Sequence, residues 1–342
     1  MARLIGILSM VVLAVALAAG GAAWWAWRAL DAPGPAAEAV IVQVPAGASL
    51  ARVAARLEEA GVVEHAPLLE WYGRLTGLAG QVHAGEYRFP PGSTTREAMA
   101  RLVSGEVVLH ALTIVEGWTF RQLRAAIEAH PDIGQKLPDA SDEELMTRLG
   151  KPGEAPEGWF LPETYRFARG TSELELLAMA HRAMVAALDA AWAGRADEIP
   201  LETPYEALIL ASIIEKETGL ADERREIAGV FARRLERGMR LQTDPTVIYG
   251  LGPEFDGNLR RVDLRTDTPY NTYTRAGLPP TPISLPGRAA LEAAVDPAPG
   301  KALFFVATGR PDGSHYFSET LEEHNRAVAR YLATLRERRE SQ

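Results

Sequence analysis

The stretch of sequence that decides the fold is Pro204–Gly219, which reads PYEALILASIIEKETG. Its apolar residues recur every three to four positions, and this periodicity predicts a helix over residues 204–218. One side of that helix is formed by residues spaced four, three and four positions apart, namely Glu206, Leu210, Ile213 and Glu217. Because Glu217 extends the apolar side, we expect its carboxyl group to be partly buried.

The carboxyl group of Glu217 is the leading candidate for proton-transfer chemistry. Burial disfavours the charged form of a carboxyl group, and the partial negative charge at the carboxyl end of a helix acts in the same direction. Gly219 is expected to stop the helix, which places Glu217 in its last turn. A glutamate whose pKa is raised toward neutrality can donate a proton and later take it back, as cleavage of a glycosidic bond requires.

Helical spacing alone leaves other interpretations of this segment open. Glu217 can instead be a surface residue near a helix end, or the partner of a basic residue such as Arg224 or Arg225. Glu215 lies two positions earlier, so its side chain projects about 200° away around the helix. It is the second candidate for the same chemistry.

The rest of the chain mixes helices and strands without a regular alternation, which predicts an α+β fold. Helical patterns cover Phe120–Ala129, Asp142–Leu149, Ser172–Ala193 and Glu223–Arg237. Two strands and a last helix are expected at Ala302–Ala307, Ser314–Ser318 and Leu321–Arg338. Long stretches rich in proline and glycine lie between these elements, at Gly150–Phe167, Gly238–Gly257 and Thr266–Gly287. Their aromatic residues favour functional loops over disorder.

A weak internal repeat follows the first 40 residues. Each copy opens with a glycine and a hydroxyl residue two positions later, at Gly47-x-Ser49, Gly92-x-Thr94 and Gly117-x-Thr119. Apolar residues follow six and ten positions after each glycine, namely Val53 and Leu57, Ala98 and Leu102, Leu123 and Ile127. The pattern predicts a strand, a glycine turn and a helix capped by the hydroxyl, with strands at Ala39–Val44, Gly85–Phe89 and Val107–Val115. The same pattern can also arise by coincidence.

An uncharged apolar run at the start of the chain predicts a membrane anchor. Leu4–Trp27 is long enough to cross a hydrocarbon core of about 30 Å, and it ends in the tryptophans Trp24, Trp25 and Trp27, which favour the membrane boundary. The competing interpretation is a cleaved signal peptide. With either, residues after the linker at 32–37 lie outside the cytoplasm, and we expect a single pass through the membrane.

Composition excludes several classes of function. The chain has 342 residues, 47% of them hydrophobic, with a formal net charge of -9 and no cysteine. An acidic chain without a basic stripe is not expected to bind nucleic acid, and disulfides and thiolate metal sites are excluded. His315 and His324 lack the spacing of metal ligands. Neither a metal nor another cofactor is expected.

Four further stretches resemble the MltG (YceG-like) family of endolytic transglycosylases, inner-membrane enzymes that cut nascent peptidoglycan. They are Ala211–Thr218 (ASIIEKET), Gly238–Gly250 (GMRLQTDPTVIYG), Pro269–Thr274 with Gly277–Pro279 (PYNTYT, GLP) and Glu157–Tyr165 (EGWFLPETY). The likeness covers nearly the whole chain. It implies that Glu217, the glutamate before threonine in EKET, is the catalytic residue. It also implies an anchor and linker at 1–36, a small LysM-like α/β module at 37–108 and a mixed α+β catalytic domain at 109–342.

The loops around this glutamate carry the expected substrate-binding residues. Their amide, hydroxyl, carboxylate and phenol groups suit sugar hydroxyls and N-acetyl groups, and the candidates are Gln242, Asp244, Asn271, Tyr273, Glu163 and Tyr165. The alternative is that Asp244-Pro245 is a turn and that the tyrosines pack in the core. The usual aspartate between glycine and threonine of LysM sequences is replaced by Ala48 and Ser93, so a packing role for that module stays open.

The resemblance also implies a mechanism. Protonated Glu217 gives its proton to the oxygen between MurNAc and GlcNAc, then takes the proton of the MurNAc C6 hydroxyl, which leaves a 1,6-anhydro end. The expected partners are glycan strands and cell-wall synthases, and the expected role is to terminate glycan growth. Two alternatives remain: a hydrolytic muramidase that uses Asp244 as a second carboxylate, and a wall-binding scaffold without catalysis.

Overall fold

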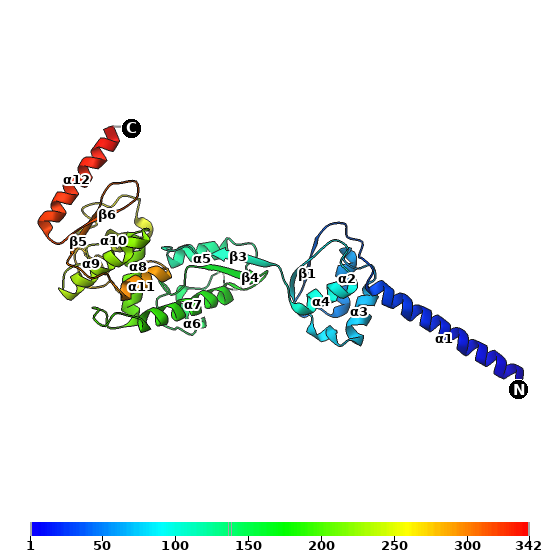
Figure 1. Cartoon of the computed structure of the whole chain (residues 1–342). Coiled ribbons are helices and arrows are strands. Elements are labelled where there is room, and N and C mark those ends of the chain that lie inside the picture. Colours follow the sequence, from blue (N-terminus) through cyan, green and yellow to red (C-terminus); the bar gives the residue numbers. More distant parts are fainter. Residues whose placement is uncertain (1, 136, 138, 341–342) are drawn as a thin grey trace. The chain divides into compact units, whose positions relative to one another are not determined.

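The computed structural model describes residues 2–135, 137 and 139–340, with no description of the side chains of residues 2–5 and 339–340 (Figure 1). The chain divides into two compact units. The first comprises Met1–His110 with Phe167–Gly170, and the second comprises Ala111–Arg166 with Thr171–Gln342. The mixture of helices and short antiparallel strands confirms the predicted α+β class.

The first unit begins with helix α1, Ala2–Leu30. Residues Gly6–Leu30 have a mean hydropathy of 2.2, and the window that could cross a membrane is fully exposed. Helix α7, Glu173–Ala193, also has the length and composition of a membrane span, but it packs in the core of the second unit. The Arg96 guanidinium lies 4.4 Å from the ring centre of Trp27, which fastens the end of α1 to the first unit.

The body of the first unit is a small α/β module. It contains β1 Val40–Val44, α2 Leu50–Glu59, α3 Ala66–Leu75, the 3-10 turn η1 Leu78–Gln81, β2 Gly85–Phe89 and α4 Thr95–Ser104. Strands β1 and β2 are antiparallel, with Val40 opposite Phe89 and Val44 opposite Gly85. The helices bury their apolar faces against Tyr87 and Phe89.

The glycine–hydroxyl repeat has the structure that its pattern predicts. The three glycines have φ values of 72°, 68° and 77°, a left-handed conformation that other residues rarely adopt. Ser49, Thr94 and Thr119 each accept a hydrogen bond from the backbone N–H three residues ahead. All six apolar positions are buried. Each copy therefore turns the chain and caps a helix whose first two turns point into a core.

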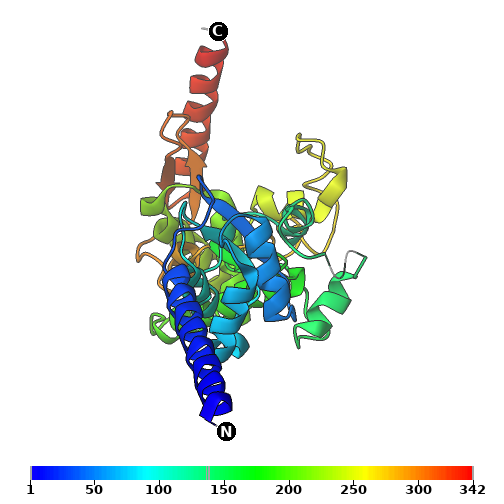
Figure 2. The same ribbon diagram turned by 90° about the vertical axis from the view of Figure 1, so that its right-hand side faces the viewer.

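The second unit is mainly helical. Its helices are α5 Phe120–Glu128, α6 Asp142–Arg148, α7, α8 Pro204–Glu217, α9 Arg224–Glu236, α10 Asp244–Leu251, α11 Arg288–Val295 and α12 Leu321–Glu340, with 3-10 turns η2 Ala221–Glu223 and η3 Gly252–Glu254. Strand β3 Leu109–Thr113 pairs with β4 Thr164–Ala168, and the boundary between the units falls within these two strands. Strand β5 Phe304–Ala307 pairs with β6 His315–Ser318 in antiparallel fashion. Figures 1 and 2 show α12 leaving this hairpin and pointing away from the other helices of the unit.

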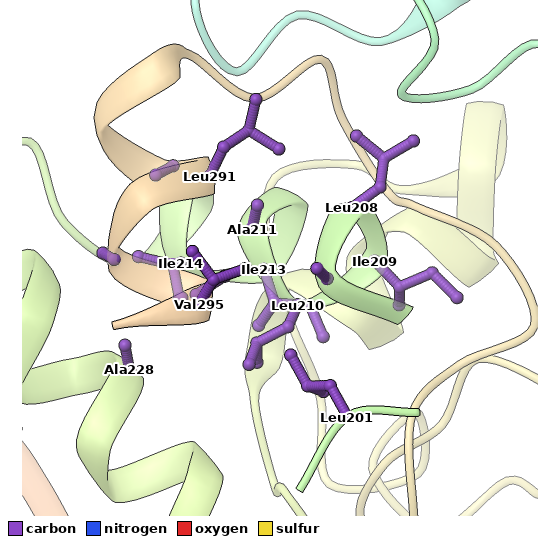
Figure 3. Packing of buried hydrophobic residues seen from close by; sticks show 14 of the residues in the cluster. Leu201, Leu208, Ile209, Leu210, Ala211, Ile213, Ile214, Ala228, Leu291 and Val295 are labelled. Carbon is purple, nitrogen blue, oxygen red and sulfur yellow. The ribbon is translucent and has the colours of Figure 1, made fainter. Parts of the chain in front are cut away.

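Helix α8 is the centre of the second unit. Residues 207–214 are all buried, and helices α7, α9, α10 and α11 pack around them. Figure 3 shows Val295 of α11 beside Ile213 and Ile214 of α8, and Leu291 of α11 and Ala228 of α9 belong to the same buried cluster. The helix is therefore buried on all sides, whereas the sequence spacing predicted a single apolar face.

Three α-helices and one strand were not predicted from the sequence. Helix α10 and strand β4 lie in stretches that were expected to be loops, and α3 and α11 had no prediction. The proline and glycine residues in these stretches do mark turns, but the turns lie where a helix or strand begins or ends. Pro245 occupies the first turn of α10, where its missing N–H would have no partner in any case.

One hydroxyl group joins α8 to the loop before α11. Ser212 is fully buried, and its Oγ accepts a hydrogen bond from the Ile283 N–H at 3.0 Å. Its backbone carbonyl accepts one from the Ser284 hydroxyl at 3.0 Å. The loop is thereby held along the central helix.

We expect Ser212→Ala to lower the free energy of unfolding by about 1–3 kcal/mol, because the Ile283 N–H is left buried without a partner. Denaturant unfolding of the full-length chain in detergent measures this change. The control is Ser104→Ala at an exposed helix end, which should change stability by less than about 0.5 kcal/mol. Equal effects of the two substitutions would contradict the role given to Ser212.

Candidate active site

A pocket of about 430 Å³ in the second unit holds the carboxyl group of Glu217. Its walls come from the ends of α8 and α9, the segment 241–244, Tyr273, strand β5 and the first turn of α12. Of the residues predicted to bind substrate, Gln242, Asp244 and Tyr273 line this pocket together with Glu217. Segments far apart in the sequence thus meet at one carboxyl group.

Glu217 lies in the last turn of α8, as predicted, and is its last residue, but the helix does not end through the glycine stop expected at Gly219. Thr218 leaves the helical conformation with φ −146°, and its Oγ1 accepts a hydrogen bond from the Leu220 N–H at 3.0 Å. Gly219 does not adopt the left-handed conformation expected of a glycine stop. The sharp exit at a buried threonine leaves the Glu217 side chain pointing to the pocket and not along a continued helix.

The two oxygens of Glu217 have different surroundings. Oε1 accepts a hydrogen bond from the Thr243 hydroxyl. Oε2 makes no hydrogen bond with any described residue. Burial raises the pKa of Glu217 to about 7, and the nearby Asp244 carboxylate acts in the same direction. The Thr243 hydrogen bond and the charge of His315 oppose this rise. Glu217 can therefore hold or release a proton near neutrality, with one oxygen left for a ligand.

A cluster of threonines fixes the hydroxyl that faces Glu217. The Thr243 N–H donates to Thr272 Oγ1 at 3.1 Å, and the Thr246 hydroxyl donates to the Thr243 carbonyl at 2.8 Å. Thr246 Oγ1 and Thr272 Oγ1 are 2.9 Å apart. The preceding residue, Gln242, has φ 54°, the only positive φ of a described residue other than glycine. Such backbone strain is held by surrounding contacts and is common at functional sites.

Asp244 and Tyr273 form a second polar pair at the exposed side of the pocket. The Tyr273 hydroxyl donates to Asp244 Oδ1 at 2.5 Å. Burial, followed by the Asp244 carboxylate, raises the pKa of Tyr273, so the phenol stays protonated and remains a donor. Asp244 is the first residue of α10, where a carboxylate is favoured by the helix dipole.

The other three predicted substrate-binding residues do not line this pocket. Asn271 is fully buried, and its amide donates to the carbonyls of Asp263 at 3.0 Å and Thr266 at 2.7 Å. Tyr165 is buried in β4 and donates to the Leu161 carbonyl. Glu163 is exposed and pairs with Arg288 at 2.9 Å. Their positions are those of residues that hold loops and a strand in place.

Glu215, the alternative to Glu217, caps a neighbouring helix. Its side chain is 6% exposed, and Oε2 accepts a hydrogen bond from the Gly287 N–H at the start of α11, at 2.9 Å. Arg224 approaches Glu215 to within 3.9 Å, and Arg225 pairs with Asp296, so neither arginine pairs with Glu217. Burial also raises the pKa of Glu215, but of these two glutamates it is Glu217 that lines the pocket.

Glu157 is a further buried carboxyl group that the sequence did not single out. It accepts hydrogen bonds from the Phe120 N–H at 2.9 Å and from the Tyr249 hydroxyl at 3.1 Å. Burial raises its pKa to about 7, against the effect of these hydrogen bonds. Glu157 thereby joins the start of α5 to α10, and it does not line the pocket that holds Glu217.

Among the described residues, no group of three or more histidines, aspartates and glutamates is arranged to hold a metal ion. His315 pairs with Glu223 at 2.7 Å, and His324 stacks on Phe304 at 5.3 Å between ring centres. Thr243 and Arg234 are pocket residues beyond the predicted set. The sequence offered only the hydroxyl of Thr243 as a signal, and none for Arg234.

A proton-transfer carboxyl at the end of a buried helix, with a Thr–Asp segment beside it, is the arrangement of a candidate acid–base enzyme site. The chain belongs to the YceG-like family, which it matches over residues 42–330. It is 31% identical over 320 residues to the endolytic murein transglycosylase of Bacillus subtilis, covering 87% of this chain and 86% of that protein.

Two further relatives support the assignment to this family. The endolytic murein transglycosylase of Streptococcus pneumoniae strain D39 is 28% identical over 336 residues, which cover 86% of this chain but only 58% of that protein. A crystal structure of a YceG-like protein from Listeria monocytogenes matches with a TM-score of 0.52 and 31% identity, over 84% of this chain and 99% of that one. The family predicted from the motifs is thus confirmed.

The raised pKa of Glu217 makes stability depend on pH. The folded state prefers the protonated carboxyl, so its contribution is complete below the usual pKa of 4.5 and is lost as the pH rises through about 7. We expect Glu217→Gln to be more stable than the wild type at pH 8 by on the order of 1–3 kcal/mol, and the difference to vanish near pH 4.

Thermal unfolding of the full-length chain in detergent between pH 4 and pH 8 measures this difference. The control Glu254→Gln removes a carboxyl from the exposed surface and should show no such pH-dependent gain. A Glu217→Gln variant that is destabilised at every pH would contradict a protonated, buried Glu217.

Proposed function

We propose that this chain is a lytic transglycosylase that acts on peptidoglycan, with Glu217 as its single acid–base residue. The observation that carries the proposal is a carboxyl group with a pKa of about 7, one oxygen bonded by Thr243 and the other free in a sugar-sized pocket. The names of the Bacillus and Streptococcus relatives support the same activity.

The proposed reaction needs one proton donor that becomes a base. Protonated Glu217 gives its proton to the oxygen between MurNAc C1 and GlcNAc, and the bond from C1 to that oxygen breaks. The Glu217 carboxylate then takes the proton of the MurNAc C6 hydroxyl, and O6 bonds to C1 to give a 1,6-anhydro end. The protons balance, because Glu217 is protonated again at the end of the reaction. The Thr243 hydroxyl stabilises the carboxylate between the two steps.

The proposed setting is the outer side of the bacterial inner membrane. Helix α1 is the anchor, residues 37–108 are a LysM-like glycan-binding module and residues 109–342 are the catalytic domain. An apolar helix whose membrane-spanning window is fully exposed, and a small α/β module with capped glycine turns, support this arrangement. An anchored site favours nascent strands close to their synthases, so the biological outcome is termination of glycan growth.

A hydrolytic muramidase is the second candidate, and Asp244 is the reason to keep it. Its carboxylate lies in the same pocket as Glu217 and raises the pKa of that residue. In a muramidase this carboxylate would activate water or stabilise the cation that forms at C1. The Tyr273 hydroxyl already binds one of its oxygens, which leaves the other for such a role.

The products of cleavage distinguish these candidates. Full-length chain in detergent, incubated with peptidoglycan, should release fragments with 1,6-anhydro-MurNAc ends that mass spectrometry identifies by their lower mass. Glu217→Gln should lose at least about a thousandfold in rate, because no donor remains. Asp244→Asn should retain the anhydro product. Reducing ends instead of anhydro ends would establish a muramidase. If no product depends on Glu217, the remaining candidate is a wall-binding scaffold without catalysis.

Thr243 should set the pH range of the reaction. Its hydrogen bond lowers the pKa of Glu217, so Thr243→Val should raise that pKa and move the alkaline fall of kcat/KM to higher pH. The maximal rate should fall by about tenfold, since the carboxylate loses its donor. Thr243→Ser keeps the hydroxyl and is the matched control. A Thr243→Val profile with an unchanged alkaline limb would argue against this hydrogen bond.

A further inference from the structure

Arg234 is a buried arginine in the wall of the active-site pocket. It lies in the last turn of α9 and is only 7% exposed. Its Nε donates to the Leu303 carbonyl at 2.7 Å, and Nη1 donates to the carbonyls of Arg240 at 3.1 Å and Leu241 at 2.8 Å. The guanidinium group is therefore fixed by the backbone of two chain segments.

The third nitrogen of this guanidinium group is left for the pocket. Nη2 of Arg234 makes no hydrogen bond with any described residue, although the residue lines the pocket that holds Glu217. No described carboxylate forms an ion pair with Arg234, and backbone carbonyls do not neutralise a full charge. A buried charge without a counter-ion is costly. The pocket thus holds a fixed positive charge and two unused N–H donors.

Arg234 carries the positive charge of this part of the pocket alone among the described residues. Arg234 is the single lysine or arginine among the described residues that line the pocket. Its guanidinium carbon lies 5.0 Å from the ring centre of Phe304, on which His324 also stacks. Burial and the charge of Arg234 lower the pKa of His324, so His324 adds no positive charge at neutral pH.

We propose that Arg234 binds a carboxylate of the peptide stem that is attached to the sugar being cleaved. This inference rests on the proposed function, because it assigns a part of that substrate to a wall of the same pocket. A guanidinium N–H and a carboxylate oxygen form a strong charge-assisted hydrogen bond. The stem extends from the lactyl group of MurNAc, the sugar whose C1 must lie at Glu217. Arg234 therefore selects strands that carry stems with a free carboxylate.

Binding to soluble glycan fragments tests this selection without cleavage. Full-length chain with Glu217→Gln, in detergent, is titrated by calorimetry with fragments that carry intact stems, stems whose carboxylates are converted to carboxamides, or no stems. We expect the intact stems to bind at least about tenfold more tightly than the carboxamides. Equal affinity for these two ligands would overturn the proposal. If only the stem-free fragments bind strongly, Arg234 binds the lactyl carboxylate of MurNAc instead, and the proposed binding of the peptide stem is refuted.

The variant that isolates Arg234 is Arg234→Lys, added to Glu217→Gln. The preference for free carboxylates should fall to less than about threefold, since an ammonium group cannot bond both the carbonyls and the ligand. Arg233→Lys is the matched control, because Arg233 lies on the same helix and bonds the carbonyls of Ala302 and Ala298 outside the pocket. This control should keep the preference. Loss of affinity for all three ligands alike in Arg234→Lys would show a structural role only.

The failure of this inference differs from the failure of the proposed function. Wild-type enzyme that forms anhydro ends equally well on free and amidated stems would refute the role of Arg234 and leave the transglycosylase intact. A binding preference for free carboxylates without any Glu217-dependent cleavage would refute the proposed transglycosylase activity but not the carboxylate-binding role of Arg234. The wild-type comparison needs no substitution, so misfolding of a variant cannot obscure it.

Discussion

The burial of α8 is the constraint on which the rest of the second unit depends. Residues 207–214 are all buried, so neighbouring helices must cover every side of this helix. Two polar side chains along it have backbone partners, since Ser212 accepts a hydrogen bond from the Ile283 N–H and Glu215 accepts one from the Gly287 N–H. Glu217 is the last residue of α8, just beyond the fully buried part of the helix. The same packing that stabilises the core therefore also removes water from the carboxyl group and raises its pKa.

The pKa of Glu217 near 7 is a balance of opposed effects. Burial and the Asp244 carboxylate favour the neutral acid, whereas the Thr243 hydroxyl and the charge of His315 favour the carboxylate. Thr243 can act only if its backbone is held, and Thr246 and Thr272 hold it through hydrogen bonds. The positive φ of Gln242 is the strained bend that brings Thr243 to Glu217, and the contacts of these threonines offset its cost.

Local patterns in the sequence predicted what depends on local interactions. The three capped helices of the glycine repeat, the ends of α8 and the α+β class were all predicted, because periodicity and caps act within a few residues. The sequence left open whether Asp244-Pro245 is a turn or part of a substrate-binding segment, and in the structure these residues begin helix α10. The partnership of Glu217 with Thr243 spans 26 residues and depends on packing that no local pattern contains. For the same reason the sequence could not distinguish Asn271, which braces a loop, from Tyr273, which lines the pocket.

A group that must first give and then take the same proton works best when both of its states are close in free energy. Burial without a donor would hold the proton too tightly for the second half of the reaction, and full hydration would release it before the first. The Thr243 hydroxyl brings the two states closer in free energy, because its hydrogen bond strengthens as negative charge forms on Oε1. Oε2, which has no partner among the described residues, can carry the proton that is transferred. An inverting mechanism with two carboxylates has no such need, since each carboxylate keeps one task, whereas the acid of a retaining mechanism must also return as a base. The hydrogen bond from Thr243 to one oxygen of Glu217 therefore supports the proposal that this residue performs both steps.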